Sequence, residues 1–158
     1  MPAASRQYML RPMADHRILI AGGGVAALEA AVALRALGGT EAQAVLVCPG
    51  ADFTLRALQV AEPFGRRAPV TFPVTEILDG LGVDHLQDTV SHVDSDGRVV
   101  LTVGGHMLPY DSLLLAVGGI GFPAYGHGIT FDRPGDPAAF MILLDDVRAG
   151  LVASVAFV

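Results

Sequence analysis

Apolar positions in the first third of the chain predict a strand, a helix and a second strand in succession. Arg17 to Ile20 is a short β-branched and apolar run, Val25 to Leu37 has helical composition closed by Gly38 and Gly39, and Ala44 to Val47 is apolar again. A βαβ unit needs about thirty residues, and this segment has that length. The two strands are therefore expected to pair in parallel.

The middle of the chain changes from an irregular pattern to an alternating one. Pro49 to Pro73 shows no sustained period, which predicts a long functional loop, and a short helix is expected over Val74 to Leu81. From Thr89 to Met107 apolar and polar residues alternate around two turn signals, Asp96-Gly97 and Gly104-Gly105. This alternation predicts a three-stranded antiparallel meander.

The last third of the chain predicts a strand, a helix and a further strand. Ser112 to Ala116 is nearly all apolar, as a strand covered on both faces of a sheet would be. Asp136-Pro137 is typical of an N-cap and first helical position, and predicts a helix that runs to about Arg148 and stops at a glycine. Leu151 to Val158 has another buried-strand pattern. Together these elements predict an α/β fold with a parallel sheet and a meander as crossover.

The turn between the first strand and the first helix carries a nucleotide-binding fingerprint. It fits G-x-G-x-x-G/A with the residues Gly22, Gly23, Gly24, Val25, Ala26 and Ala27. Gly22 permits the tight turn, Gly24 lets the backbone approach a pyrophosphate, and Ala27 lets the helix pack close to the sheet. Free N–H groups at the helix start favour an anion there. We therefore expect a dinucleotide on a Rossmann-like sheet, the alternative being a glycine-rich loop without a ligand.

A dinucleotide site also needs an acidic residue near the end of the second strand, where it accepts hydrogen bonds from a ribose. Cys48 stands in that place, and the nearest acid is Asp52, four residues later. Asp52 is interpreted either as a displaced ribose ligand or as an ordinary loop carboxylate. Cys48 is interpreted as a small packed residue, with a redox thiol as the alternative.

Composition and charge exclude several classes of function. The 158 residues are 52% hydrophobic, yet no apolar run reaches about eighteen residues, so no membrane-spanning helix is expected. A net charge of -6 and scattered arginines argue against nucleic-acid binding. The single Cys excludes an internal disulfide or CxxC pair. Residues 1–16 lack the apolar core of a signal peptide, and are expected to form a disordered leader of a cytoplasmic protein.

The chain contains five histidines, a residue type that commonly binds metal ions. Three of them lie in the strand-rich region, His85, His92 and His106. No HxH, HExxH or His-Cys spacing is present, so we expect these side chains at the surface or in turns and predict no metal site.

The order of these segments resembles a family of flavoproteins. Where an NAD-binding unit has a crossover helix, this chain has the meander, followed by YDSLLLAVGG from Tyr110 to Gly119. That arrangement resembles the FAD domain of the two-dinucleotide-binding flavoproteins, whose YDxLhhATG motif is matched except that Val117 stands where Thr is common. Within them, HRILIAGGGVAALEAAVALRAL, AVLVCPGADFTLRALQVAEPFG and VASVAFV are most similar to the type II NADH dehydrogenase and sulfide:quinone oxidoreductase group.

The resemblance implies FAD as the cofactor and assigns residues to it. Three small residues of the fingerprint would hold the pyrophosphate: Gly22, Gly24 and Ala27. Three residues after the later strand would lie along the cofactor: Ala116, Val117 and Gly118. The backbone of Val90 would meet the adenine. Arg56 would lie close to the flavin end, the alternative being a solvent-facing loop arginine.

The resemblance also implies a function for the whole protein. Residues 17–158 would be the amino-terminal part of the FAD-binding domain, truncated before the NAD(P)H domain, of an oxidoreductase passing electrons from NAD(P)H through FAD to a quinone or similar acceptor. The chain alone is then expected to be inactive and to self-associate through the edge beside Leu151 to Val158. Peripheral contact with the inner face of a membrane is a further expectation. Alternatives are an NAD(P)-binding dehydrogenase domain, which the meander disfavours, and a noncatalytic nucleotide-binding or protein-interaction module.

Overall fold

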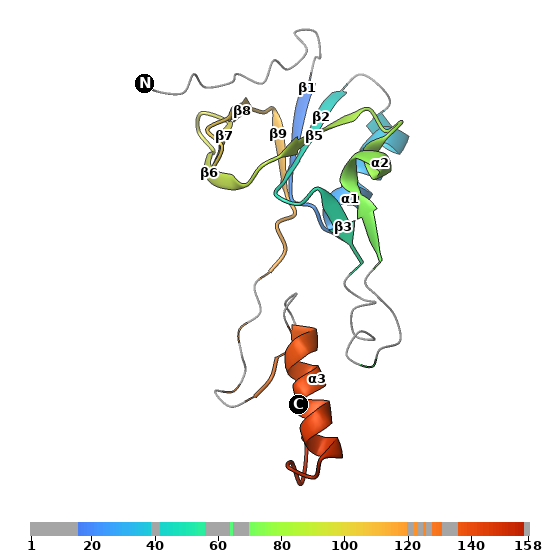
Figure 1. Ribbon diagram of the computed structural model, residues 1–158. Helices are drawn as coiled ribbons and strands as arrows, with labels where there is room; N and C mark the ends of the chain where they lie inside the picture. Colours follow the sequence, from blue (N-terminus) through green and yellow to red (C-terminus); the bar gives the residue numbers. More distant parts are fainter. Residues whose placement is uncertain are drawn as a thin grey trace, which may run out of the picture. The chain divides into compact units, whose positions relative to one another are not determined.

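The computed structural model describes residues 16–38, 42–55, 64, 70–119, 122, 125, 128–130 and 136–156. They fall into two compact units. The first unit contains the described residues up to Thr54 together with Thr71–Gly118, and the second contains those of Leu55–Val70 and Gly119–Val158. Figure 1 shows the elements of both. The predicted leader lies outside the described residues except for His16, which begins the first strand.

A four-stranded parallel sheet organises the first unit, in the order β5-β2-β1-β9. Its strands are β1 (His16–Ala21), β2 (Ala42–Cys48), β5 (Val83–Gln87) and β9 (Ser112–Leu115). Ile18 of β1 lies opposite Ala44 on one side and Ser112 on the other. The parallel βαβ pairing predicted from the sequence is confirmed.

Two helices cover one face of this sheet (Figure 1). Helix α1 (Val25–Gly38) buries its small residues Ala27 and Ala31, which pack with Ile20 and Leu46 of the central strands. Small side chains let the helix axis lie close to the strands, as the fingerprint requires. Helix α2 (Val74–Leu78) adds its two buried residues to the same cluster.

The predicted meander covers the opposite face of the sheet (Figure 1). It consists of β6 (Val90–Asp94), β7 (Val99–Thr102) and β8 (Met107–Pro109), paired antiparallel in that order. Its buried side chains pack on the odd-numbered residues of β1 and β2, because successive strand residues point to opposite faces. This second cluster is formed by Leu19, Val45, Val47, Leu86, Val100, Leu108 and Tyr110.

Three local predictions are corrected by the structure. Strand β5 was not predicted, because only its first and fourth residues are buried and VDHLQ shows neither a continuous apolar run nor strict alternation. The expected loop from Pro49 to Pro73 contains a short antiparallel pair, β3 (Asp52–Thr54) with β4 (Thr71–Pro73). This pair could not be predicted from a short turn motif, because its two strands are far apart in sequence. Helix α2 ends at Leu78, earlier than the expected Leu81.

Strand β9 was expected to be covered on both faces, and among the described residues it is not. It lies at the edge of the sheet, where Leu114 is 40% and Leu115 58% exposed. Its apolar sequence is typical of a central parallel strand, but an edge strand has neighbours on one side only.

The second unit contains helix α3 (Asp136–Arg148), as predicted. The helix ends at Arg148, the positive φ of 74° at Gly150 closes the turn that follows it, and the amide of Leu151 donates to the carbonyl of Asp146 (2.9 Å). The strand expected from Leu151 onward is not formed over residues 151–156. A strand requires a partner strand for its N–H and C=O groups, and the described residues pair none with this segment.

An ion pair at the amino-terminal end of the sheet joins β1 to β9. Asp111 accepts hydrogen bonds from the backbone amide of Arg17 (2.8 Å) and from its Nε (3.0 Å), and the amide of Asp111 donates to the carbonyl of Arg17 (2.9 Å). These bonds from Arg17 lower the pKa of Asp111 from 3.8 to about 2. The aspartate of the YD dipeptide thus aligns two neighbouring strands.

This carboxylate makes a testable contribution to acid stability. A carboxyl group whose pKa is lowered by folding stabilises the protein above its unfolded pKa, and the contribution is lost as pH falls through the folded pKa. Replacing Asp111 by Asn should therefore lower the free energy of unfolding at about pH 5, and the difference from wild type should shrink as pH falls from 3.8 to about 2. Urea unfolding at stepwise pH measures this. A difference that stays constant over the range would contradict the assignment.

Candidate functional site

The carboxyl ends of all four parallel strands meet at one edge of the sheet. After β1 the chain turns into α1 and builds β2 and β5 on one side, whereas β9 lies on the other side of β1. The junction of β1 and β9 is thus the point where the strand order reverses. Ligands of open α/β sheets bind outside the carboxyl ends at such a point.

Gly22 fixes the turn at this junction. Its φ is +135°, and its amide donates to the carbonyl of Val47 (2.8 Å). A Cβ at Gly22 would collide with the carbonyl oxygen of Ala116 and lie 2.6 Å from its carbonyl carbon. The turn after β1 therefore lies directly against the segment after β9.

Gly24, Val25 and Ala26 form the exposed rim of the turn. A Cβ at Gly24 would have no heavy atom within 4 Å, so the protein itself does not require glycine there. The first hydrogen bonds of the helix are donated by Ala27 (3.1 Å) and Leu28 (3.2 Å) to the carbonyl of Gly24. The amides at the rim precede these bonds and are the groups from which a phosphate at a helix N-terminus accepts. The residues present therefore fit the pyrophosphate of a dinucleotide.

The segment after β9 forms the other side of the junction. The amide of Ala116 donates to the carbonyl of Ala21 (2.8 Å), and beyond it Val117 and Gly118 are exposed. Val117 is 69% exposed, and Gly118 has a φ of +75°. The position of these residues along a cofactor stays a prediction.

Cys48 lies beneath the turn as a packed residue. It is 2% exposed, and a Cβ at Gly23 would be 2.9 Å from the Cβ of Cys48. Its Sγ is 3.3 Å from both the carbonyl of Gly50 and Nε2 of His85. Burial raises the pKa of the Cys48 thiol and lowers that of His85, which favours the neutral form of both groups. His85 is half-buried in β5, and the expected surface or turn position is wrong for it because β5 was not predicted.

Three further residues were predicted from the sequence to contact the cofactor. Asp52 begins β3 with an exposed side chain, and its role toward a ribose stays a prediction. Val90 begins β6, directly after the connection that leaves β5. Arg56 lies outside the described residues.

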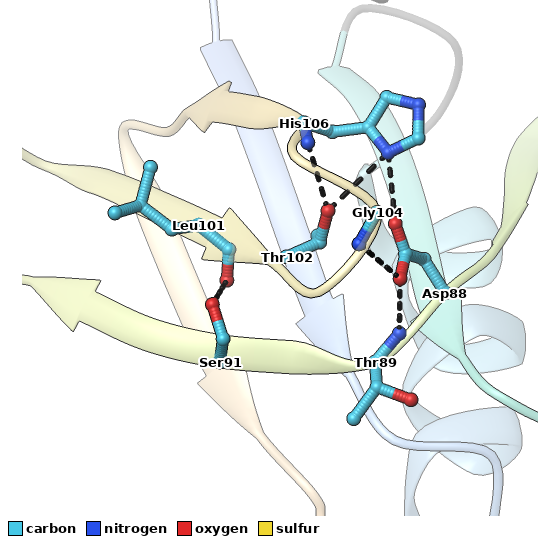
Figure 2. A network of polar contacts seen from close by, with 7 residues as sticks. All are labelled: Asp88, Thr89, Ser91, Leu101, Thr102, Gly104 and His106. Atoms are coloured by element: carbon cyan, nitrogen blue, oxygen red, sulfur yellow. Dashed lines mark hydrogen bonds and ion pairs between the residues drawn. The ribbon is translucent and has the colours of Figure 1, made fainter. Parts of the chain in front are cut away.

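A polar network that the sequence interpretation missed lies at the same edge of the sheet (Figure 2). Asp88 Oδ1 accepts from the amides of Thr89 (2.7 Å) and Gly104 (3.1 Å), and Oδ2 lies 2.8 Å from Nδ1 of His106. Burial raises the pKa of Asp88, but hydrogen bonds from Thr102, His106 and the two amides outweigh it and bring the value to about 2. No local motif marks this network, since its members come from two connections far apart in sequence.

Within the part of the chain that the structure describes, no group of three or more His, Cys, Asp or Glu side chains is placed to hold a metal ion. Of the described helices, none has the length and apolar character needed to cross a membrane.

Comparison with known proteins was made by sequence and by structure. No family model matches the sequence, and no curated protein matches it. Among solved structures, the sulfide:quinone oxidoreductase of Aquifex aeolicus has a TM-score of 0.74 at 21% identity, over 85% of this chain and 32% of that one. NDH2 from Plasmodium falciparum in complex with NADH gives 0.64 at 16%, over 89% and 31%. Putidaredoxin reductase in its complex with putidaredoxin gives 0.64 at 24%, over 83% and 34%.

These similarities define the class of fold. The chain has the fold of a portion of the FAD-dependent pyridine nucleotide oxidoreductases, which confirms the predicted fold class and, as a likeness of fold, the resemblance. It spans about a third of the length of the solved structures that it matches.

Proposed function

We propose that this chain binds FAD at the carboxyl edge of its parallel sheet, as the amino-terminal part of an NAD(P)H-dependent flavin oxidoreductase. The observation that supports this most directly is the glycine turn at the junction of β1 and β9, where Gly24 faces open space while Gly22 is packed against Ala116. A turn without a ligand has no physical need for a glycine at the open position. The meander in place of a crossover helix favours FAD over NAD(P).

The residues of this chain bind and orient the cofactor. The amides of Gly24, Val25 and Ala26 would donate to the pyrophosphate, and the dipole of α1 adds to the attraction. Ala116, Val117 and Gly118 would lie along the part of the cofactor over β9, with the backbone of Val90 toward the other part. FAD, when bound, supplies the two-electron carrier, and no side chain of this chain is assigned a proton transfer.

The route of electrons belongs to the whole protein. We propose that NAD(P)H reduces the flavin and that a quinone or similar acceptor receives the electrons, in a cytoplasmic protein with peripheral contact at the inner face of a membrane. Among the similar structures, NDH2 is described in complex with NADH, and putidaredoxin reductase in complex with putidaredoxin. The chain alone is proposed to be inactive, and self-association at the segment from Leu151 to Val158, which forms no strand over residues 151–156, stays a prediction.

FAD should bind the 158-residue chain more tightly than FMN or NAD. The reason is that the fingerprint requires a pyrophosphate, which FMN lacks, and that the meander distinguishes this fold from an NAD-binding unit. Equilibrium dialysis of the chain against each of the three compounds measures the order. Tighter binding of NAD than of FAD would reject the proposal in favour of a dehydrogenase domain, and binding of none of them would favour a noncatalytic interaction module.

A further inference from the structure

The carboxylate of Asp88 holds together two connections of the first unit, that between β5 and β6 and that between β7 and β8. The amide of Val103 donates to the carbonyl of Thr89 (2.8 Å), which adds a backbone bond between the same two segments. The Asp88 side chain is only 10% exposed, although it lies between two surface connections. Figure 2 shows its two oxygens turned toward Thr89, Gly104 and His106.

The oxygens of Asp88 are already used by these partners. A carboxylate offers about four acceptor sites. Three donors lie within hydrogen-bond distance of this one, the amides of Thr89 and Gly104 and Nδ1 of His106, and together they engage both oxygens. The hydroxyl of Thr102 in turn accepts from the amide of His106 (2.9 Å), so the turn between β7 and β8 is held on both sides. Asp88 is therefore arranged to position the backbone and not to contact a ligand itself.

This network lies close to the place where the adenosine half of a dinucleotide is expected. The amide of Asp88 donates to the carbonyl of Cys48 (3.0 Å), at the end of β2, where a ribose carboxylate is expected in such sites. A cofactor with its pyrophosphate on the turn after β1 must place its adenosine half over β2. Since β5 is the next strand, the connection that Asp88 holds forms the adjoining wall.

From this geometry we infer that Asp88 is a positioning residue for the adenosine half of the bound dinucleotide. It fixes the connection at Thr89 against the turn at Gly104 and His106, beside the strand end where Cys48 stands in place of the expected carboxylate. The inference rests on the proposed function, and names the element that determines affinity for the adenosine half.

The test compares two carboxylates of the same unit in the full 158-residue chain. Asp88→Asn removes one acceptor oxygen from the network, and Asp111→Asn makes the same change at the amino-terminal end of the sheet. Titration calorimetry with FAD and with ADP, which contains only the adenosine and pyrophosphate, should show both affinities about tenfold weaker for Asp88→Asn. Both affinities should be unchanged for Asp111→Asn. The visible absorption spectrum of FAD bound to Asp88→Asn should equal that of wild type, because the flavin half of the proposed FAD would lie over β9, away from Asp88.

A second pair of variants covers the case in which Asp88→Asn does not fold. Thr102→Val removes the hydroxyl with little change in shape, and Thr102→Ser retains it. ADP should bind Thr102→Val more weakly and Thr102→Ser as it binds wild type.

The outcomes separate this inference from the proposed function. The inference would be overturned if ADP bound Asp88→Asn as tightly as Asp111→Asn, or Thr102→Val as tightly as Thr102→Ser. In that case, FAD binding by wild type would still uphold the proposed function. Wild type that binds ADP but not FAD would reject the flavin function, and a weaker ADP affinity of Asp88→Asn would then still support the positioning role. Wild type that binds neither compound would overturn both.

Discussion

Replacing Gly24 by Val is expected to abolish FAD binding by this chain while leaving the parallel sheet folded. No heavy atom lies within 4 Å of the position that a Cβ would take at Gly24, so the protein itself has room for a side chain. That same space is the one through which a pyrophosphate would reach the amides at the start of α1. A branched side chain would hold the phosphates away from those amides and forfeit several charge-assisted hydrogen bonds together.

A matched control for this change lies at the other end of the same helix. Gly38 also has no heavy atom within 4 Å of its would-be Cβ, so Gly38→Val adds the same side chain away from the site. FAD titration and thermal unfolding of both variants should show unaltered affinity for Gly38→Val and loss of affinity for Gly24→Val, with far-ultraviolet circular dichroism close to wild type in each. If Gly24→Val bound FAD as tightly as wild type, the turn would hold no phosphate.

Much of the first unit was predictable because its elements leave local signals. The apolar run of β1, the glycine turn and the alanine-rich α1 follow one another directly, and the turns of the meander carry Asp-Gly and Gly-Gly pairs. Strand β5 was missed because an edge strand with two buried residues has no clear period. The strand predicted over residues 151–156 was wrong for the opposite reason. Their sequence is typical of a strand, but a strand forms only where a partner strand is available.

The residues of the candidate site also differ in whether a local sequence pattern could reveal them. Gly22, Gly24 and Ala27 were proposed from their spacing alone, because the fingerprint lies within six consecutive residues of the chain. Asp88 could not be identified in this way, since it follows the unpredicted β5 and its partner His106 is eighteen residues further on. Such a network becomes visible only when the β7–β8 turn is placed beside the end of β5.

The largest loss of stability is expected from Gly22→Ala. Gly22 has a φ of +135°, a conformation that L side chains rarely adopt, and the new Cβ would meet the carbonyl group of Ala116. The strained backbone and the steric clash each cost roughly 1–3 kcal/mol, so a loss of about 3 kcal/mol or more in the free energy of unfolding is expected. Because domains of this kind have only about 5–15 kcal/mol of stability, that is a large fraction. Urea unfolding followed by circular dichroism measures it.

Gly24→Ala is the control, because it adds the same methyl group two residues further along the same turn, where the space is open. Its free energy of unfolding should stay within about 1 kcal/mol of wild type, since glycine and alanine differ by that amount in a helical context. Gly22→Ala should also weaken FAD binding, because relieving the clash requires the turn after β1 to move away from Ala116 and the residues that follow it. Equal stability of the two variants would mean that the turn after β1 does not lie against the segment after β9, and the site would lose the junction on which its assignment depends.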